Sequence, residues 1–278
     1  MENQLKKTPV IVMHMSGAYL KQSFYRDASE TGAGRAGHPV LELDCREIAG
    51  TNCYCDEQAK EQLRERISQA GAWEQKQDVR EQFKETPGAG TPGIHFLDSG
   101  NYHYLSLLWM EHIREPFSLV VFDKHPDMLR PAFGDITSCG GWVREALETN
   151  PFLEKVYLVG IAAKLWDEVR EQLSQEPEGA ELLERVELGE EALLSRRIYL
   201  SLDKDVLRQA DARCDWDQGD MTLDELLERA KRIAAAHEII GVDVCGERPE
   251  SGSGEDIRVN DRTNRKLLEA AVGWLAGC

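Results

Sequence analysis

Short runs of apolar residues recur along the chain, and most of them lack the alternation of apolar and polar positions that marks a half-exposed strand. They are rich in Val, Ile and Leu, which is typical of strands buried on both faces of a parallel sheet. Seven such runs lie at residues 10–13, 40–43, 94–97, 119–122, 156–159, 198–202 and 239–244. We therefore expect a mainly parallel sheet of about seven to eight strands.

Charged stretches with roughly helical periodicity separate these runs and predict the helices. They lie at residues 56–70, 103–114, 141–147, 164–173, 223–237 and 263–276. Thr222 precedes one of them and is followed three residues later by Glu225, the arrangement of a capping box. The alternation of strand and helix favours a three-layer, doubly wound α/β fold, and we expect a single domain over residues 1–278.

The amino-acid composition argues against two classes of binding partner. The 278 residues include 33 Lys and Arg against 50 Asp and Glu, which gives a formal net charge of −17. This excess of acid argues against binding to nucleic acid or to an anionic membrane, because both require basic surfaces. No apolar run approaches the roughly 20 residues that span a bilayer, and no signal-peptide segment follows the polar N-terminus. The seven scattered cysteines fit a reducing compartment, so we expect a cytoplasmic protein.

Side chains that bind metals follow three of the predicted strands. Residues 123–127 read Asp-Lys-His-Pro-Asp after one apolar run, and residues 203–205 read Asp-Lys-Asp after another. Residues two apart in an extended chain point to the same side, and ligands bind beyond the carboxyl ends of strands in such sheets. A His also follows the run at 94–97. The candidate metal ligands are therefore His103, Asp123, His125, Asp127, Asp203 and Asp205.

The residue types in this set indicate which metals it would bind. Carboxylates crowded at one sheet edge repel one another unless cations neutralise them. Carboxylates with a minority of imidazoles suit Mn²⁺, with Fe²⁺, Co²⁺ or Zn²⁺ as alternatives. Six ligands are too many for one tetrahedral zinc and about right for two ions with bridging carboxylates. A hydroxide held between two such ions is a strong nucleophile at neutral pH.

The acidic motifs resemble those of the ureohydrolases, the family of arginase, agmatinase and formimidoylglutamase within the arginase/deacetylase superfamily. The motif at 123–127 is similar to the family's Asp-Ala-His-x-Asp, and Ser-Leu-Asp-Lys-Asp at 201–205 is similar to a second family motif. Gly-Asn-Tyr-His at 100–103 stands where the family has Gly-Gly-Asp-His. The resemblance covers about residues 94–249 and implies the arginase-like fold.

The resemblance also implies how the six ligands divide between two manganese ions per chain. One ion would be held by His103 and Asp127 and the other by His125 and Asp205, with Asp123 and Asp203 bridging both.

The chain departs from the family in two places. Ureohydrolases carry a His, thought to shuttle protons, in the loop after the first acidic motif, whereas the loop at 133–142 contains none. The family's substrate-side Glu follows an Asp by three positions. Here Gly246 stands at that position, and Glu247 comes one residue later. A shift of one residue at a strand end can turn a side chain to the other face.

Several residues are candidates for the roles that these departures leave open. Glu247 is the candidate acid at the substrate, and His14 is a candidate general acid–base with a loop-capping role as its alternative. Asp217 and Gln218 are candidates for holding a cationic substrate. Ser138 is a candidate donor to a substrate carboxylate or an N-cap, and Trp216 is either a pocket wall or a packing residue.

The residues and the resemblance together predict a hydrolase that cleaves a C–N bond of a guanidino, amidino or related small molecule. One alternative is a deacetylase-like amidohydrolase with a single zinc at Asp123, His125 and Asp203, and another is a metal-stabilised binding protein without catalysis. The expected partner is a small molecule, with a cationic one favoured, and neither nucleic acid nor membrane. The sequence leaves homo-oligomerisation open.

Overall fold

A parallel sheet of eight strands forms the centre of the computed structural model, which describes residues 8–26, 38–76, 93–131, 134, 136–190, 193, 195–249 and 252–276. In spatial order its strands are β2 (Val40–Asp44), β1 (Val10–His14), β4 (Ile94–Phe96), β10 (Glu238–Cys245), β9 (Arg197–Asp203), β5 (Phe117–Phe122), β7 (Leu153–Val159) and β8 (Val186–Leu188). All of its strand pairs are parallel. Each of the seven predicted runs forms one of these strands.

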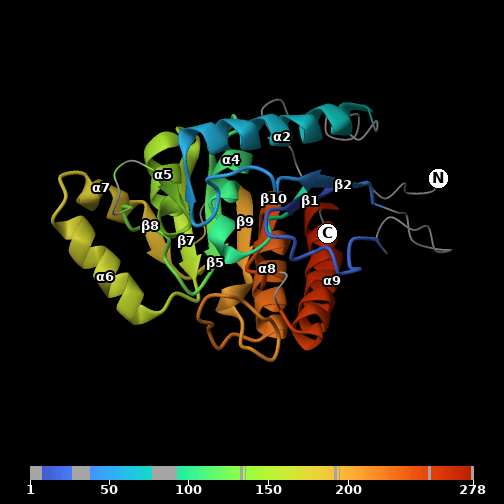
Figure 1. The fold of residues 1–278 in the computed structure, drawn as a ribbon. Helices are drawn as coiled ribbons and strands as arrows, with labels where there is room; N and C mark the ends of the chain where they lie inside the picture. Colours follow the sequence, from blue (N-terminus) through green and yellow to red (C-terminus); the bar gives the residue numbers. More distant parts are fainter. Residues whose placement is uncertain are drawn as a thin grey trace, which may run out of the picture.

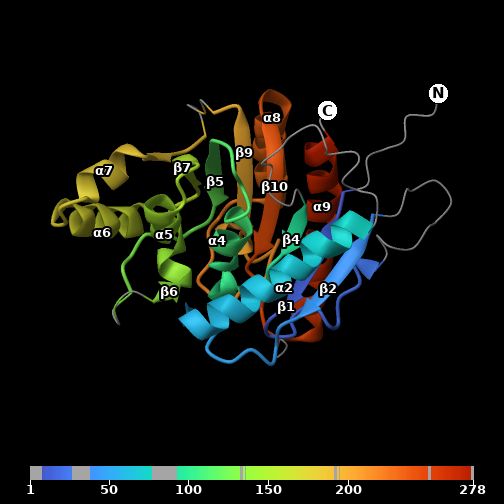
Figure 2. The same cartoon turned by 90° about the horizontal axis from the view of Figure 1, so that it is seen from above.

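Helices cover both faces of the sheet, which confirms the three-layer α/β arrangement (Figures 1 and 2). One layer contains α2 (Glu57–Lys76), α4 (Leu105–Met110) and α5 (Trp142–Thr149), and the other contains α8 (Leu223–Ala236) and α9 (Gly254–Ala276). Helices α6 (Ala163–Ser174) and α7 (Gly179–Glu184) lie beside β8 at one end of the sheet (Figure 1). The cap predicted for α8 is confirmed, because the Thr222 side chain accepts a hydrogen bond from Glu225 N at 3.1 Å.

The apolar strands bury side chains on both faces of the sheet. In β5, Leu119 and Val121 pack into the core beneath α4 and α5, whereas Val120 and Phe122 pack into the core beneath α8 and α9. All six residues of β5 are buried. Burial on both sides explains why this strand reads as a continuous apolar run.

The short elements were not predicted. Strands β3 (Tyr54–Cys55) and β6 (Thr137–Ser138) form a small antiparallel pair, and α7 and β8 were also missed. The 3₁₀-helices η1 (Gly100–Tyr102), η2 (Cys139–Gly141) and η3 (Lys204–Val206) each follow a strand. Helix α9 begins at Gly254, before the predicted start at residue 263. The missed elements contain no apolar run as long as those of the predicted strands, so the sequence gives no signal for them.

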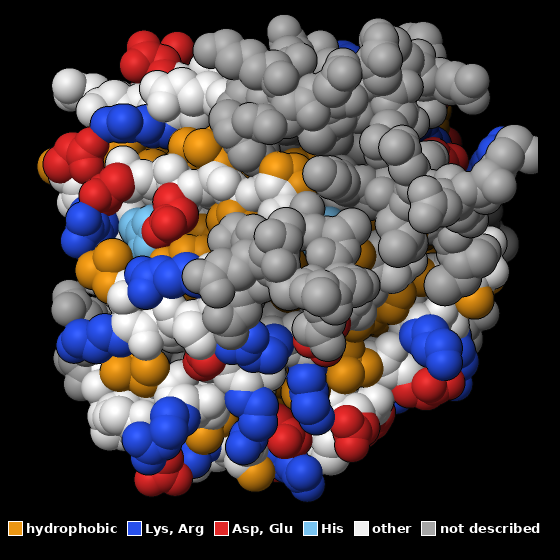
Figure 3. Space-filling view, turned by 90° about the vertical axis from the view of Figure 1, so that its right-hand side faces the viewer, with side chains coloured by type: hydrophobic (Ala, Val, Ile, Leu, Met, Phe, Trp, Pro, Cys, Tyr) orange, Lys and Arg blue, Asp and Glu red, His pale blue; other side chains and the backbone are white. Residues whose placement is uncertain are grey.

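The helices and the surface add two observations. No helix in the described ranges combines the length and the apolar character needed to cross a membrane. Figure 3 shows the molecule from the side of β2 and α9, where basic and acidic side chains are intermingled over the lower part of the face.

Candidate metal centre

The candidate metal centre forms where the neighbouring strands β5 and β9 end. Phe122 pairs with Leu202 in the register of these strands, so Asp123 and Asp203 follow at the same edge of the sheet. Both carboxylates are almost completely buried. Since the strands are parallel, the residues that follow them are brought to one place, as expected from the sequence.

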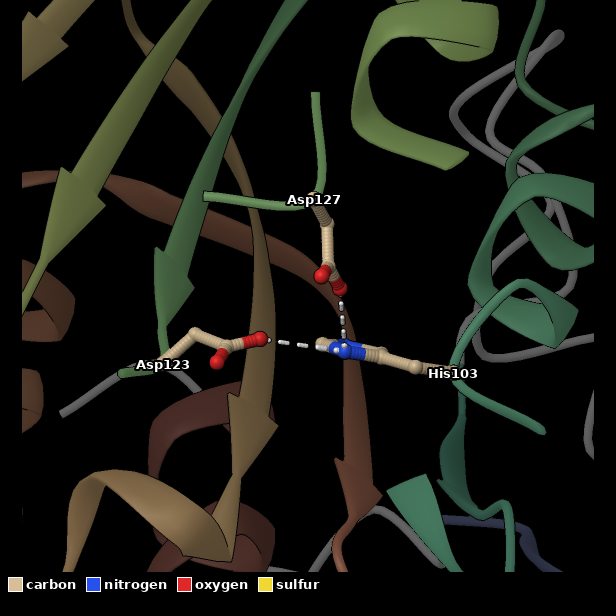
Figure 4. Close-up of side chains that lie close together, drawn as sticks. All are labelled: His103, Asp123 and Asp127. Carbon is tan, nitrogen blue, oxygen red and sulfur yellow. Dashed lines mark ion pairs between the residues drawn. The ribbon is translucent and has the colours of Figure 1, made fainter. Parts of the chain in front are cut away.

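The first group of ligand candidates surrounds His103, which follows η1. Its Nδ1 lies 3.2 Å from Asp123 Oδ2 and 3.2 Å from Asp127 Oδ2. Figure 4 shows both carboxylates turned toward the His103 ring. Asp203 Oδ2 lies 3.5 Å from the same nitrogen. The other ring nitrogen, Nε2, lies 2.8 Å from Ser201 Oγ. This contact holds the imidazole so that Nδ1 points at the carboxylates.

The second group surrounds His125. Its Nδ1 lies 2.8 Å from Asp205 Oδ2 and 3.6 Å from Asp123 Oδ1. Asp123 therefore turns one oxygen toward each histidine, and it belongs to both groups. Backbone amides help to orient the carboxylates: His125 N donates to Asp123 Oδ1 at 2.6 Å, and Lys124 N donates to Asp205 Oδ1 at 3.0 Å.

Burial and crowding make it harder to ionise these carboxyl groups. Burial, followed by the charge of Asp205, raises the pKa of Asp203 from 3.8 to about 6. Burial, followed by the charge of Asp123, raises the pKa of Asp205 to about 7. Burial also raises the pKa of Asp127. The group therefore favours a bound positive charge, because the carboxylates repel one another in a medium of low polarity.

The same carboxylates raise the pKa values of the two imidazoles. Burial acts to lower the pKa of His125, but the hydrogen bonds and charges of Asp123 and Asp205 outweigh it and raise that pKa to about 12. The pKa of His103 is likewise raised well above its usual value. His103 Nδ1 is buried within ion-pair distance of Asp123 and Asp127, but it forms no hydrogen bond of good geometry among the described residues. A buried nitrogen in this state, facing carboxylate oxygens, fits a ligand to a divalent cation.

A cavity of about 250 Å³ opens over the two groups. Its inner side presents the acidic ligand candidates, and its outer wall includes Leu129, Leu165, Glu168 and Trp216. At the base of the cavity, a Cβ on Gly100 would lie 2.9 Å from Trp216 Cδ1 and 3.3 Å from an Asp203 oxygen. Only glycine allows the tryptophan to approach the metal centre this closely.

Two of the predicted substrate-side residues lie beside His125. The ring of Trp216 meets the His125 ring edge-on, with 5.6 Å between their centroids, so Trp216 is a wall of the cavity. Asp217 Oδ1 lies 3.2 Å from His125 Nε2. Lys124 Nζ donates a hydrogen bond to Asp217, which lowers the pKa of this carboxyl group. Asp217 thus contacts the histidine on the side away from Asp205.

Glu247 does not line this cavity, contrary to the role expected for it. Its carboxylate is fully buried and forms an ion pair with Lys204 Nζ. It also accepts hydrogen bonds from Asn264 Nδ2 at 2.6 Å, from Asn260 Nδ2 at 2.9 Å and from Gln22 Nε2 at 2.9 Å. With this many partners the side chain is engaged inside the protein, and we assign it no contact with substrate.

The one-residue shift at the end of β10 explains this position. Gly246 has a φ of +83°, and a Cβ there would lie 2.2 Å from Asp203 Oδ1. A side chain at position 246 would therefore displace a candidate metal ligand. The acidic residue stands one position later and points to the opposite side, as expected from the alternation of a strand end.

Three other predicted site residues also lie elsewhere. His14 ends β1, which β4 and β10 separate from β9, and its Nε2 lies 2.9 Å from Glu42 Oε2. Ser138 lines a neighbouring cavity, and its side chain does not cap η2. Gln218 Nε2 donates to Leu207 O at 2.9 Å, so its amide holds a loop. We assign none of the three to the metal centre or its cavity.

The sequence did not single out several residues that shape the site. Ser201 precedes Asp203 by two positions and shares its strand face, so the period of a strand is a signal that points to it. Trp142 Nε1 donates to Asp127 Oδ2 at 2.7 Å, but it comes from α5 and has no local signal. Leu129 and Glu168 reach the cavity from a loop and from α6, which only the folded chain reveals.

Solved structures with the same fold include several hydrolases. An agmatine ureohydrolase of Thermoplasma volcanium superposes with a TM-score of 0.62 at 14% identity, covering 99% of this chain and 92% of that one. A formimidoylglutamase from Bacillus subtilis gives 0.60 at 15% identity, with 99% and 89% covered. A proclavaminate amidino hydrolase from Streptomyces clavuligerus gives 0.60 at 14% identity, with 98% and 93% covered. At these identities the likeness shows the fold.

The sequence comparisons identify the family. A protein from Thermotoga maritima, described as uncharacterized, is 31% identical over 179 residues, which cover 64% of this chain and 67% of that protein. The model of the Arginase family matches residues 103–260, more than half of the chain, and this range contains all six ligand candidates. The chain therefore belongs to the arginase family.

Proposed function

We propose that this protein is a metal-dependent hydrolase that cleaves a C–N bond of a small amidino, guanidino or related compound. The observation that carries the proposal is the position of Asp123, whose two oxygens face two separate groups of ligand candidates. Two groups that share a carboxylate support two divalent cations, and the carboxylate-rich set favours Mn²⁺, with Fe²⁺, Co²⁺ or Zn²⁺ as alternatives. The ureohydrolase and amidino hydrolase names among the similar structures support the reaction class.

The residues of the chain would each contribute a defined part of the chemistry. Divalent cations held by the two groups would make water nucleophilic at neutral pH and stabilise negative charge at the reacting carbon. Trp216 would limit where the head group of the substrate lies. Asp217 would keep the His125 ring oriented. With a guanidino compound, one water molecule is added, the bond from the central carbon to the substituted nitrogen breaks, and urea and an amine are formed.

The geometry favours two metal ions over the single zinc ion of the deacetylase-like alternative. That alternative requires Asp123, His125 and Asp203 to converge on one ion. In the structure, Asp203 Oδ2 faces His103 at 3.5 Å, and Asp203 Oδ1 accepts a hydrogen bond from Asp205 N at 2.8 Å. His125 is grouped with Asp123 and Asp205 instead.

The proposal is tested by metal content together with turnover. The protein is purified without chelator and loaded with manganese, and bound metal is measured by mass spectrometry. We expect two ions per chain for the unmodified protein and one for Asp127→Ala or Asp205→Ala. Asp167→Ala, at an exposed position on α6, is the matched control and should retain two. Urea release from a panel of guanidino compounds should follow the metal content.

Each other outcome would change the assignment. One zinc ion that survives Asp127→Ala, together with cleavage of acylated amines, would support the deacetylase-like alternative. Two ions without hydrolysis of any guanidino, amidino or acylated compound would support a metal-stabilised binding protein. No bound metal under either condition would contradict the proposed hydrolase.

A further inference from the structure

The outer wall of the cavity presents apolar side chains to solvent. Large apolar side chains that are exposed are few among the described residues: Tyr54, Leu129, Leu188 and Trp216. Two of these, Leu129 at 42% exposure and Trp216 at 40%, line this cavity. Leu165 of α6, which is half-buried, and Pro126, which is buried, also line the cavity. Exposed apolar residues gathered at a concave site indicate an apolar occupant.

The charges around the cavity are almost all negative. No Lys or Arg is among the described residues that line it. Lys124, the basic residue between two ligand candidates, donates hydrogen bonds to Asp217 and to Gln218 O. Arg130 lines the neighbouring cavity and is paired with Glu176 at 3.1 Å. In the described part of the wall, no cation is placed to receive a substrate carboxylate.

Glu168 is the charged residue of the outer wall, and it is exposed. Its carboxylate lies 3.8 Å from Lys164 Nζ, one turn away on α6. An exposed carboxylate that already has a cationic neighbour contributes little to binding a second cation. Along most of the wall, a charged tail of the substrate would lose its hydration on contact with leucine and tryptophan side chains. It would gain no oppositely charged partner there.

We infer that the substrate of this site has an apolar alkyl or aryl tail beyond its reactive head group, and that it carries no carboxylate. The inference rests on the proposed function and deepens it by specifying the part of the substrate outside the metal centre. An apolar tail would gain affinity from contact with Leu129, Leu165 and Trp216, by about fourfold for each methylene that is fully buried. A carboxylate tail would lose hydration along this wall and gain no cationic partner among the described residues that line it.

The first test compares tails on one head group. Ethylguanidine, butylguanidine, 4-aminobutylguanidine and 5-guanidinopentanoate share the guanidinium and differ in the length or charge of the tail. Their dissociation constants are measured by calorimetry on manganese-loaded and on metal-free protein, in the cold, with urea release assayed separately. Butylguanidine should bind about tenfold more tightly than ethylguanidine. It should also bind more tightly than the amino compound, and the carboxylate compound should bind most weakly.

A second test changes the wall. Leu129→Arg should strengthen binding of 5-guanidinopentanoate and weaken binding of butylguanidine, because it replaces an apolar contact with a cation. Leu188→Arg is the matched control, since Leu188 on β8 is also exposed, at 51%, and does not line the cavity. This control should leave the order of affinities unchanged.

The outcomes separate this inference from the proposed function. If the carboxylate or the amino compound binds or is cleaved best, the inference is wrong even though urea is released. If butylguanidine binds best but no compound yields urea, the inference about the tail holds and guanidines are excluded as the hydrolysed substrates. If affinity does not depend on the tail, or no compound binds, the apolar wall does not select substrate and the inference is overturned.

Discussion

Two buried clusters of charge lie on opposite sides of the same three residues at the end of β9. Asp203 and Asp205 point into the candidate metal centre, where the carboxylates outnumber the imidazoles. Lys204, between them, points the other way and is fully buried against Glu247. There one cation meets one anion, and amides of Gln22 and Asn264 complete the hydrogen bonding.

The comparison distinguishes a charge pair that stabilises the fold from a group of side chains whose excess negative charge favours a bound cation. Around Lys204 and Glu247 the charges balance and the hydrogen bonds are made, so nothing further is needed. Around His103 the carboxyl pKa values are raised, and a ring nitrogen forms no hydrogen bond of good geometry among the described residues. Unbalanced buried charge is costly to maintain, and a bound cation removes the cost.

The largest effect of a single substitution is expected from removing one charge of the buried Lys204–Glu247 pair. Glu247→Ala leaves the Lys204 ammonium buried and unpaired, so the free energy of unfolding should fall by about 3–5 kcal/mol. Denaturation in urea measures this change. Glu171→Ala, at an exposed position on α6, should change stability by less than about 0.5 kcal/mol. If Glu247→Ala lowers the free energy of unfolding as little as the control does, the Lys204–Glu247 pair does not stabilise the fold.

Metal binding should stabilise the protein through the cluster around His103 and His125, and it should not depend on the Lys204–Glu247 pair. Manganese at about 100 times its dissociation constant should stabilise the fold by about 2.7 kcal/mol for each site, and a chelator should reverse the effect. Thermal unfolding measures the shift. Asp127→Ala should lose part of the response, whereas Glu247→Ala should retain a manganese response from its lower starting point. A melting temperature that does not respond to manganese would contradict the comparison.

A smaller effect is expected from the residue that orients His103. Ser201→Ala removes the contact of 2.8 Å at Nε2, and affinity for one of the two manganese ions should fall by about 10- to 100-fold. Metal titration followed by calorimetry measures this change. Ser118→Ala, which removes another buried serine hydroxyl of the central strands, is the control and should leave metal affinity unchanged. Equal affinities in the two variants would show that Ser201 does not orient a ligand.

The last prediction concerns pH. In the folded, metal-free protein the pKa values of Asp203 and Asp205 are about 6 and about 7, against an ordinary value of 3.8. Between pH 3.8 and about 7 the folded state binds more protons than the unfolded state, so stability should fall as the pH rises through this window. The raised pKa of His125 acts in the same direction above pH 6.5.

The pH dependence is checked by melting the metal-free and the manganese-loaded protein across this window. Manganese should reduce the decline, because the cation takes over the role of the bound protons. Asp205→Asn should also reduce it in the metal-free protein. A metal-free protein that gains stability between pH 5 and 7 would show that other groups dominate the titration.

The sequence by itself determined seven of the eight strands of the large sheet and the set of ligand candidates. Continuous apolar runs identify strands buried on both faces, and the two-residue spacing in Asp123, His125 and Asp127 places these side chains at one strand end. Because parallel strands end at one edge, the aspartates after residues 122 and 202 were expected together, and the register of β5 and β9 brings them together. These features depend on the period of a strand and on chain direction, which are local.

Tertiary structure alone decided where the other side chains of the site point. Glu247 was expected at the substrate, but β10, α9 and the loop that carries Gln22 surround it with partners for its charge. The apolar wall joins Leu129, Leu165 and Trp216 from segments far apart in the chain. The direction of a side chain at a strand end depends on which neighbours supply hydrogen bonds and space, and those neighbours come together only when distant segments pack.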